Sequence, residues 1–220
     1  MEQTRPSLPI EMRLLEAAID QFGREGLDGA STRKIAAAAA TTMSAITYHY
    51  GGKEGLYLAA ARYIAEQIGQ RMAPALAASE AGVVRGAGPD AATKALLTLM
   101  DRFVEVMTDP ESERWARFIV REQMDPTEAF DTIFATMGVV THRIVALVEA
   151  LAEGRCDATE VRLRVLAIIG QALVFRTARS SLLRLIGWRE IHADGVAAIQ
   201  RVVRAHTLAI VHCSFREADQ

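Results

Sequence analysis

The sequence predicts an all-α protein with a small N-terminal helical domain and a larger C-terminal helical domain. Almost every segment spaces its apolar residues three or four positions apart, and no segment alternates convincingly as a strand. Half of the 220 residues are hydrophobic, which is ample for a buried core in each domain. We expect the domains to comprise residues 1–52 and 53–220.

The first helix is expected from about Leu8 to Glu25. Pro9 is tolerated in the first turn of a helix, and Gly26 is a residue type that commonly ends one. The inner face of this helix is expected to consist of Leu14, Leu15, Ala18 and Phe22.

Residues 31–50 indicate two short helices joined by a tight turn. Ser31 or Thr32 can cap the first helix, because a hydroxyl there accepts a hydrogen bond from a free backbone amide. Thr42 can cap the second, expected from Met43 to about His49. On that second helix, Ile46 and Tyr50 are expected to face the core, while the outward positions are those of Ser44, Ala45, Thr47 and Tyr48.

Charge near these helices differs from that of the whole chain. The chain carries 25 Lys plus Arg and 27 Asp plus Glu, whereas the segment from Gly29 to Lys53 holds Arg33, Lys34 and Lys53 and no acidic residue. Such a local basic patch favours a specific phosphate contact over general polyanion binding. Lys53 also opens the next helix, where free amides favour a phosphate.

Two short helices with a basic, hydroxyl-rich outer face are typical of a helix-turn-helix that binds double-stranded DNA. We expect Arg33 to reach a guanine edge or a phosphate, and the small outward residues Ser44, Ala45 and Thr47 to meet bases. The phosphate backbone is expected to bind Thr42, Tyr48, His49 and Lys53. The complete predicted DNA-binding set is Thr32, Arg33, Thr42, Ser44, Ala45, Thr47, Tyr48, His49 and Lys53.

These segments resemble the DNA-binding domain of the TetR/AcrR family of bacterial transcriptional repressors. The resemblance is carried by residues 14–26, 31–36 and 47–56, and residues 45–48 with 53–59 are especially similar to the CecR-like branch. Beyond about residue 60 the likeness to that branch is only general. The resemblance implies a ligand-responsive regulator, most simply a repressor that a small molecule releases from a palindromic operator.

Three residues depart from the family pattern. Ala40 stands where the turn usually has Gly, Thr47 where Tyr is usual, and Tyr50 where Phe is usual. A left-handed conformation at Ala40 would cost about 1 to 2 kcal/mol, so we expect a turn of different shape. The phosphate contact usually made at position 47 is expected to pass to Tyr48.

The larger domain is expected to contain six further helices. The fourth helix of the chain, from Lys53 to about Met72, connects the domains, and a loop is expected over residues 81–89. Capping signals at residues 125–128, with Pro126 in the first turn, and at 157–160 open two long helices. The expected ranges are 53–72, 90–107, a short helix with Trp115 and Phe118, 126–152, 158–185 and 195–211.

The last two of these helices are richly apolar over a wide face. On the final one, Val196, Ile199, Val203 and Ile210 share one side, and Val202 widens it. The resemblance implies that these helices pair with their twins in a homodimer, whose two-fold symmetry suits half-sites about 34 Å or more apart. The alternative that both helices belong to the core of one protomer stays open.

The resemblance also implies a pocket for a small-molecule effector in the larger domain. Aromatic walls with a few polar groups build such pockets, although the same residues can equally be core. Arg176 and Arg179 interrupt an apolar helix; they could hold an anionic ligand, pair with Glu122 or Glu149, or bond across a dimer seam. The candidate ligand residues are Trp115, Phe118, Arg121, Glu122, Phe134, Met137, His142, Phe175 and Arg176.

Other classes of protein fit less well. Residues 51–53 lack the spacing of a P-loop, and no histidine follows a Glu by three positions as in di-iron bundles, so we expect no enzyme, cofactor or metal site. A helical adaptor without DNA binding would leave the acid-free segment unexplained. Cys156 and Cys213 are expected to be buried and inert. The apolar run 165–175 is about half the roughly 20 residues of a membrane span, so we expect a cytoplasmic protein without a membrane partner.

Overall fold

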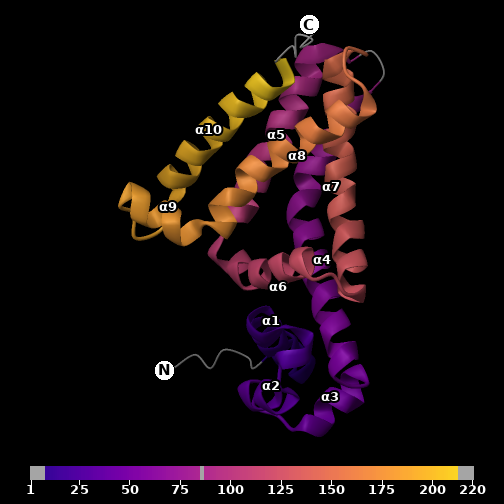
Figure 1. Ribbon diagram of the computed structural model, residues 1–220, viewed down its shortest axis with the longest axis vertical. Coiled ribbons are helices and arrows are strands. Elements are labelled where there is room, and N and C mark those ends of the chain that lie inside the picture. The colour runs from indigo at the N-terminus through magenta and orange to yellow at the C-terminus, as the bar shows by residue number, and fades with distance from the viewer. Residues whose placement is uncertain (1–7, 85–86, 213–220) are drawn as a thin grey trace, which may run out of the picture. The chain divides into compact units, whose positions relative to one another are not determined.

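The computed structural model describes residues 8–84 and 87–212, and over these ranges it contains helices and no strand. The predicted all-α class is therefore confirmed (Figure 1). The helices are α1 Ile10–Gly29, α2 Thr32–Ala38, α3 Met43–Tyr50, α4 Lys53–Ala78, α5 Gly88–Thr108, α6 Glu113–Met124, α7 Glu128–Ala152, α8 Ala158–Thr177, α9 Arg179–Ile186 and α10 Ala193–His212, with short 3-10 turns at Glu80–Val83 and Pro110–Ser112.

These helices form two compact units. The first contains the chain up to Gln67 together with Glu113–Thr136, and the second contains Ile68–Ser112 and the chain from Met137 onward. Helices α4 and α7 each continue from one unit into the other. The sequence-based division after residue 52 separates the predicted DNA-binding segment from the predicted ligand-binding and dimerisation segment, and it does not coincide with these compact units. That division by function stays a prediction.

In the first unit, α1 packs against α6. The predicted inner residues Leu14, Ala18 and Phe22 are fully buried, whereas Leu15 is only half-buried. The two helices approach closely at Gly23, where a Cβ atom would lie 3.2 Å from Arg117 Cβ. Gly26 interrupts the helical dihedral angles of α1 with φ 73° and ψ −178°, but α1 continues to Gly29 instead of ending at Gly26 as predicted, so the glycine kinks the helix.

In the second unit, α5 packs against α8 and α10. Their shared core contains Leu96, Leu99, Val165, Ile168 and Val203. Ile199, Val203 and Val211 are buried, so one part of the apolar face of α10 packs in the protomer core. Val202 is half-exposed, so another part of that face is uncovered in the protomer.

Helix α4 is longer than predicted. It continues through Pro74 to Ala78 instead of ending near Met72. Proline cannot donate to the carbonyl four residues earlier, that of Gln70, so Pro74 removes one hydrogen bond from this helix. Arg102 Nε donates to the Arg71 carbonyl at 2.6 Å, and Arg143 Nη1 donates to the Leu76 carbonyl at 3.1 Å. These long-range donors, invisible to local periodicity, accompany the continuation of the helix.

Two helix boundaries in the second half of the chain also differ from prediction. The single helix expected over 158–185 is divided at Ala178, which leaves helical geometry with φ −107° and ψ 28°. Helix α7 begins at Glu128, after Pro126, because Thr127 accepts a hydrogen bond from the Ala129 amide and acts as its cap. Asp157 caps α8 as predicted, accepting from the amides of Thr159 and Glu160.

Two further expectations concern cysteines and the membrane. Cys156 is partly exposed and not buried as expected, and Cys213 lies outside the described residues. Among the described residues, α7 is long and apolar enough to cross a membrane by length and composition. One such helix is weak evidence for a membrane span, since core helices of globular proteins have the same composition.

Candidate nucleic-acid interface

The first helix of the predicted helix-turn-helix begins at a capped residue. Ser31 has extended backbone angles, and its hydroxyl accepts a hydrogen bond from the Lys34 amide at 3.4 Å, as predicted for a cap. Ile35 and Ala36 of α2 are buried against the rest of the unit. Burial of this face leaves Arg33 and Lys34 on the solvent side.

The turn after α2 adopts a left-handed residue without glycine. Ala40 has φ 50°, its amide donates to the Ala37 carbonyl, and the Thr41 amide donates to the Ala36 carbonyl. These two bonds define a Schellman motif, in which Ala40 occupies the position that glycine usually takes. The expectation that alanine would give the turn another shape is therefore wrong, because the two hydrogen bonds hold Ala40 in the left-handed region.

This geometry leads to a stability prediction. Ala40→Gly should stabilise the first unit by about 0.5 to 1 kcal/mol, since relief of left-handed strain exceeds the greater flexibility of glycine in the unfolded chain. Ala38→Gly is the matched control: it removes the same atom from the right-handed end of α2 and should destabilise by about 1 kcal/mol. Urea unfolding of the two variants measures both effects, and equal shifts would contradict strain at Ala40.

Helix α3 is anchored by its inner face. Ile46 is 2% exposed, and the half-buried Tyr50 donates its hydroxyl to the Glu11 carbonyl at 2.9 Å. Burial raises the pKa of Tyr50, and the nearby Glu11 carboxylate raises it further. The departure from Phe at this position thus adds one bond between α3 and α1.

The cap of α3 differs in detail from the expectation. Thr42 occupies the capping position, but its side chain does not bond a backbone amide. Instead, Thr42 Oγ1 and Ser44 Oγ lie 2.8 Å apart and share a hydrogen bond. This pair orients two hydroxyls together on the exposed side of the helix.

The predicted DNA-binding residues fall into two groups by exposure. Tyr48 is 85% exposed. The exposed group is Arg33, Thr42, Ser44, Thr47 and Tyr48, and the partly exposed group is Thr32, Ala45, His49 and Lys53. Because Ser44, Thr47 and Tyr48 lie opposite the buried Ile46, they are available to a partner on the solvent side.

The segment that is acid-free in sequence has acidic neighbours in space. Lys34 Nζ lies 3.1 Å from Glu25 Oε1, and His49 Nδ1 lies 3.3 Å from Glu11 Oε1. Lys53 Nζ donates to the Asp28 carbonyl at 2.9 Å. Within the described part of the chain Arg33 has neither an ion pair nor a hydrogen bond from its side chain, so it is the cation of this face best placed to accept a new anion.

The junction between α3 and α4 is fixed by glycines. Gly51 ends α3 in the left-handed conformation with φ 75°, and the Gly52 carbonyl accepts from the Leu56 amide at 3.1 Å. At Gly55, a Cβ atom would lie only 1.8 Å from the Tyr50 carbonyl oxygen. The first turn of α4 can therefore approach the end of α3 only without a side chain at position 55.

Five candidate ligand residues lie in the first unit, and two of them, Phe118 and Glu122, are at most 1% exposed. Phe118 is fully buried, and its ring centre lies 4.7 Å from that of Tyr57. Glu122 is 1% exposed and accepts hydrogen bonds from the Tyr57 hydroxyl and from the amide and hydroxyl of Thr127. Burial and the hydrogen bond to Glu122 raise the pKa of Tyr57.

The other three residues of that unit differ in exposure. Trp115 is buried, and Arg121 Nη2 donates to the Arg24 carbonyl at 3.0 Å. Phe134 is 61% exposed and stacks on Phe130 with ring centres 5.5 Å apart. Phe134 is thus the aromatic candidate of this unit with the most surface left for a ligand.

The remaining candidates, in the second unit, differ in exposure. Met137 and Phe175 are half-buried and His142 is exposed. Arg176 is buried and donates to the Val106 carbonyl at 3.4 Å, the Asp109 carbonyl at 2.5 Å and the Ser112 hydroxyl. These bonds run from Arg176 to the end of α5 and the turn after it, and the expected pairing with Glu122 or Glu149 stays a prediction.

Sequence reasoning missed the residues that complete these networks. Tyr57 and Thr127 hold Glu122, and Arg71 pairs with Asp109 and with Glu111, the latter at 2.7 Å. A tyrosine on an otherwise apolar helical face was the one available signal, since a buried hydroxyl requires a partner. The nitrogen Arg179 Nε is buried without a hydrogen-bond partner in the described residues.

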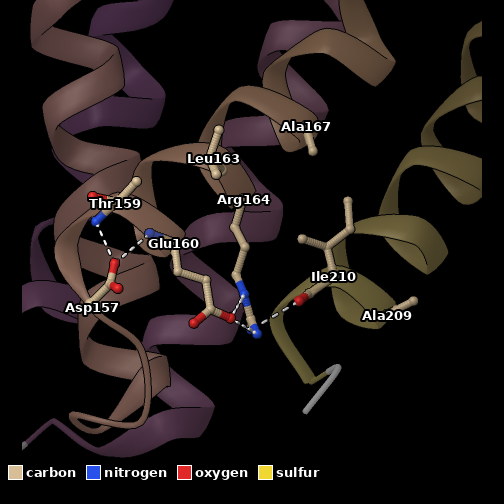
Figure 2. A pocket seen from close by; sticks show the side chains of 8 residues that line it. All are labelled: Asp157, Thr159, Glu160, Leu163, Arg164, Ala167, Ala209 and Ile210. Atoms are coloured by element: carbon tan, nitrogen blue, oxygen red, sulfur yellow. Dashed lines mark hydrogen bonds and ion pairs between the residues drawn. The ribbon is translucent and has the colours of Figure 1, made fainter. Parts of the chain in front are cut away.

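A groove of about 710 Å³ lies between α8 and α10 (Figure 2). Leu163 and Ala167 line it from α8, and Ala209 and Ile210 line it from α10. None of the nine candidate ligand residues lines this groove, so it is separate from the predicted effector contacts.

Comparisons with known proteins place this geometry among bacterial regulators. The family model for bacterial regulatory proteins of the tetR family matches residues 14–60, and that for the C-terminal domain of the HTH-type transcriptional dual regulator CecR matches residues 92–212. The chain is 33% identical over 197 residues to the HTH-type transcriptional dual regulator CecR of Shigella flexneri, covering 88% of this chain and 87% of that protein.

Solved structures are similar in fold. A tetR-family regulator from Rhodococcus RHA1 has a TM-score of 0.64 at 22% identity, covering 94% of this chain and 99% of the other. AibR, solved in complex with isovaleryl coenzyme A and operator DNA, has a TM-score of 0.65 at 15% identity, covering 90% and 97%. The likeness therefore extends over both units.

Proposed function

Since the chain belongs to the TetR family of bacterial regulatory proteins, in the branch of the regulator CecR, we propose that it is a repressor that a small molecule releases from a palindromic operator. As a member of this family it is a ligand-responsive, DNA-binding regulator of transcription, and we propose that it has no enzymatic activity. One observation carries the proposal: α3 buries Ile46 and presents Ser44, Thr47 and Tyr48 to solvent beside Arg33.

The exposed face suits the wide groove of a DNA duplex. Small hydroxyls at Ser44 and Thr47 can approach base edges, where a hydroxyl donates or accepts. Tyr48 is highly exposed and can reach a phosphate, which compensates for the absence of a tyrosine at position 47. Thr42, His49 and Lys53 flank this face and are assigned to the phosphate backbone, and Thr32 and Ala45 complete the contact set.

Variants at Arg33 and Lys53 distinguish a contact to a base from a contact to a phosphate. Arg33→Ala should weaken operator binding by about 1 to 3 kcal/mol and relax the preference at one operator position, if the guanidinium reads a guanine. Lys53→Ala should weaken binding on all sequences and lower the salt slope by about one unit. Binding titrations on operator variants at several salt concentrations measure both.

The control for these two variants is Arg189→Ala. Arg189 is an exposed cation in the segment before α10, so its loss changes net charge equally without touching the proposed interface. Binding by Arg33→Ala indistinguishable from that by the Arg189 variant would remove Arg33 from the interface.

A homodimer is the second part of the proposal. Six large apolar side chains on α8, α9 and α10 are about half-exposed or more: Leu163, Leu166, Val174, Leu185, Ile186 and Val202. Apolar patches of more than a few hundred Å² mark interaction sites on soluble proteins. A two-fold pair of such faces would place two copies of α3 on the two half-sites of an inverted repeat.

We propose that the effector causes release of the operator through contacts inside the first unit. Helix α6 holds α1 through the Arg121 bond to the Arg24 carbonyl and through close packing at Gly23, and it holds α4 through Glu122 and Tyr57. A ligand that prefers another placement of α6 therefore moves the helices that carry α3. Nearly complete release takes about 5.5 kcal/mol of differential binding between the two states.

Two experiments test the proposed function. Sequencing DNA selected by the purified chain should yield an inverted repeat, and DNA recovered without sequence preference would contradict the proposal. A thermal-shift screen with antibiotics, aromatic acids and acyl-coenzyme A compounds should find ligands that then release the DNA. Acyl compounds are included because AibR was solved with isovaleryl coenzyme A.

Transcription of a reporter under the selected operator decides the direction of regulation. The relative CecR is named a dual regulator, so activation is the alternative to repression. A repressor should lower reporter output, and the effector should restore it. We place the protein in the cytoplasm, where an operator on the chromosome is accessible.

A further inference from the structure

The chain passes between its two compact units at three places. These lie after Gln67, after Ser112 and after Thr136. The first and third lie inside α4 and α7, which remain helical across the boundary. The second lies where the 3-10 turn Pro110–Ser112 meets the first residue of α6. Hydrogen bonds of a 3-10 turn have poorer geometry than those of an α-helix, so this crossing depends most on side chains to hold it.

The side chain of Arg176, near the end of α8, holds this turn. Arg176 is 6% exposed, and its Nη2 donates to the Asp109 carbonyl at 2.5 Å and to the Val106 carbonyl at 3.4 Å. The same nitrogen donates to the hydroxyl of the buried Ser112, which in turn donates to the Val106 carbonyl at 2.6 Å. One guanidinium therefore connects α8 to the whole segment between the last turn of α5 and the start of α6.

The same turn is held from α4 by Arg71. The guanidinium of Arg71 pairs with the carboxylate of Asp109 and, at 2.7 Å, with that of Glu111. Asp109 thus bonds to α4 through its carboxylate and to α8 through its carbonyl. A guanidinium donates in fixed directions, so these bonds are satisfied in one placement of the turn and weaken together when the turn shifts. The turn therefore has one preferred placement instead of a continuous range.

We propose that Arg176 is a positioning residue for operator binding: by fixing the turn before α6, it keeps α6 in the placement that the operator-bound protein requires. The inference rests on the proposed function. Glu113 follows Ser112 directly, so a shift of the turn moves the first residue of α6. Helix α6 bonds to α1 through Arg121 and to α4 through Glu122, and α1 packs against α2 of the helix-turn-helix.

This role gives α8 a part in operator release, and it is an alternative to the predicted ligand contact at Arg176. An effector that favours another placement of the turn breaks the bonds of Arg176 and thereby weakens operator binding. Because coupling between two sites is reciprocal, removal of the guanidinium should change operator affinity in the same direction as the effector does.

Arg176→Met tests the assignment in the full-length chain, with the inverted-repeat DNA that this chain selects as the probe. Methionine keeps an unbranched apolar chain in the buried site but removes the donors, so operator affinity should fall about tenfold or more. Arg176→Lys should restore part of the affinity, because an ammonium group still donates to acceptors of the turn. Binding titrations measure the affinities, and urea unfolding measures the stability of each variant.

The matched control is Arg164→Met, at another buried arginine of the same helix. Arg164 is 7% exposed and bonds to Glu160 and to the Ile210 carbonyl (Figure 2), about 18 Å along the helix axis from Arg176. Its loss should lower the free energy of unfolding without changing operator affinity. Equal losses of operator affinity in the Arg176→Met and Arg164→Met variants would overturn the positioning role.

Hydrogen exchange locates the effect within the fold. In Arg176→Met, amides of α6 beyond its first turn should exchange at least about tenfold faster, while amides of α10 keep their rates. Faster exchange over α5, α8 and α10 together, with operator affinity unchanged, would overturn the proposal and make Arg176 a core residue only. A chain that selects no DNA would overturn the proposed function, and the exchange of α6 would then still decide whether Arg176 fixes the start of that helix.

Discussion

Gly55→Ala should unfold the junction between α3 and α4 and abolish specific DNA binding. The added Cβ would lie 1.8 Å from the Tyr50 carbonyl oxygen, which belongs to the backbone and cannot rotate away. Overpacking at such a site costs about 3 kcal/mol or more, at the upper end of the range for inserted atoms. The angle between α3 and α4 would have to change, and with it the direction of the exposed Ser44, Thr47 and Tyr48 face.

This effect can be measured in the first unit alone. The chain has two tryptophans, and only Trp115 lies in that unit, so a Trp188→Phe background reports its unfolding by fluorescence. Gly29→Ala is the matched control, since its Cβ would lie at an ordinary 3.4 Å from Glu25 Cβ. Normal stability and operator affinity in Gly55→Ala would show that the junction adapts, and would contradict the tight approach.

Phe118→Ala should destabilise the first unit by about 3 to 5 kcal/mol, as truncation of a fully buried aromatic does. Phe118 is inaccessible to solvent and packs on Tyr57, whose ring lies in turn 4.8 Å from that of Phe22. A cavity at this point would loosen α6 from α1 and α4 together. The predicted ligand contact at Phe118 is therefore proposed to be secondary to its role in the core.

Phe134→Ala provides the contrast. Phe134 is mostly exposed and has the stacked ring of Phe130 as its aromatic neighbour, so its truncation should change stability by less than about 1 kcal/mol. Where an effector is found, loss of its affinity in the stable Phe134 variant would support a ligand contact. Equal unfolding free energies for the Phe118 and Phe134 variants would contradict the assigned packing.

Features that depend on residues close together in the chain were predictable, whereas features that depend on residues far apart in the chain were not. Helical periodicity, the cap at Asp157 and the buried side of α3 at Ile46 depend on residues within a few positions of each other, and all were predictable. The break at Ala178 and the continuation of α4 through Pro74 were not predictable. Near Pro74, a bond between residues far apart in the chain, from Arg102 to the Arg71 carbonyl, accompanies the longer helix, and local spacing cannot indicate such a bond.

The same distinction holds at the candidate interface. Local spacing alone determined that α2 and α3 form a helix-turn-helix with Ser44, Thr47 and Tyr48 on its outer side, because these positions follow from the helical repeat. Only the tertiary structure decided that Glu25 and Glu11 approach Lys34 and His49, and that Lys53 meets a carbonyl of α1. A charge count along the chain cannot detect neighbours that folding brings together, and electrostatic partners depend on distance in space.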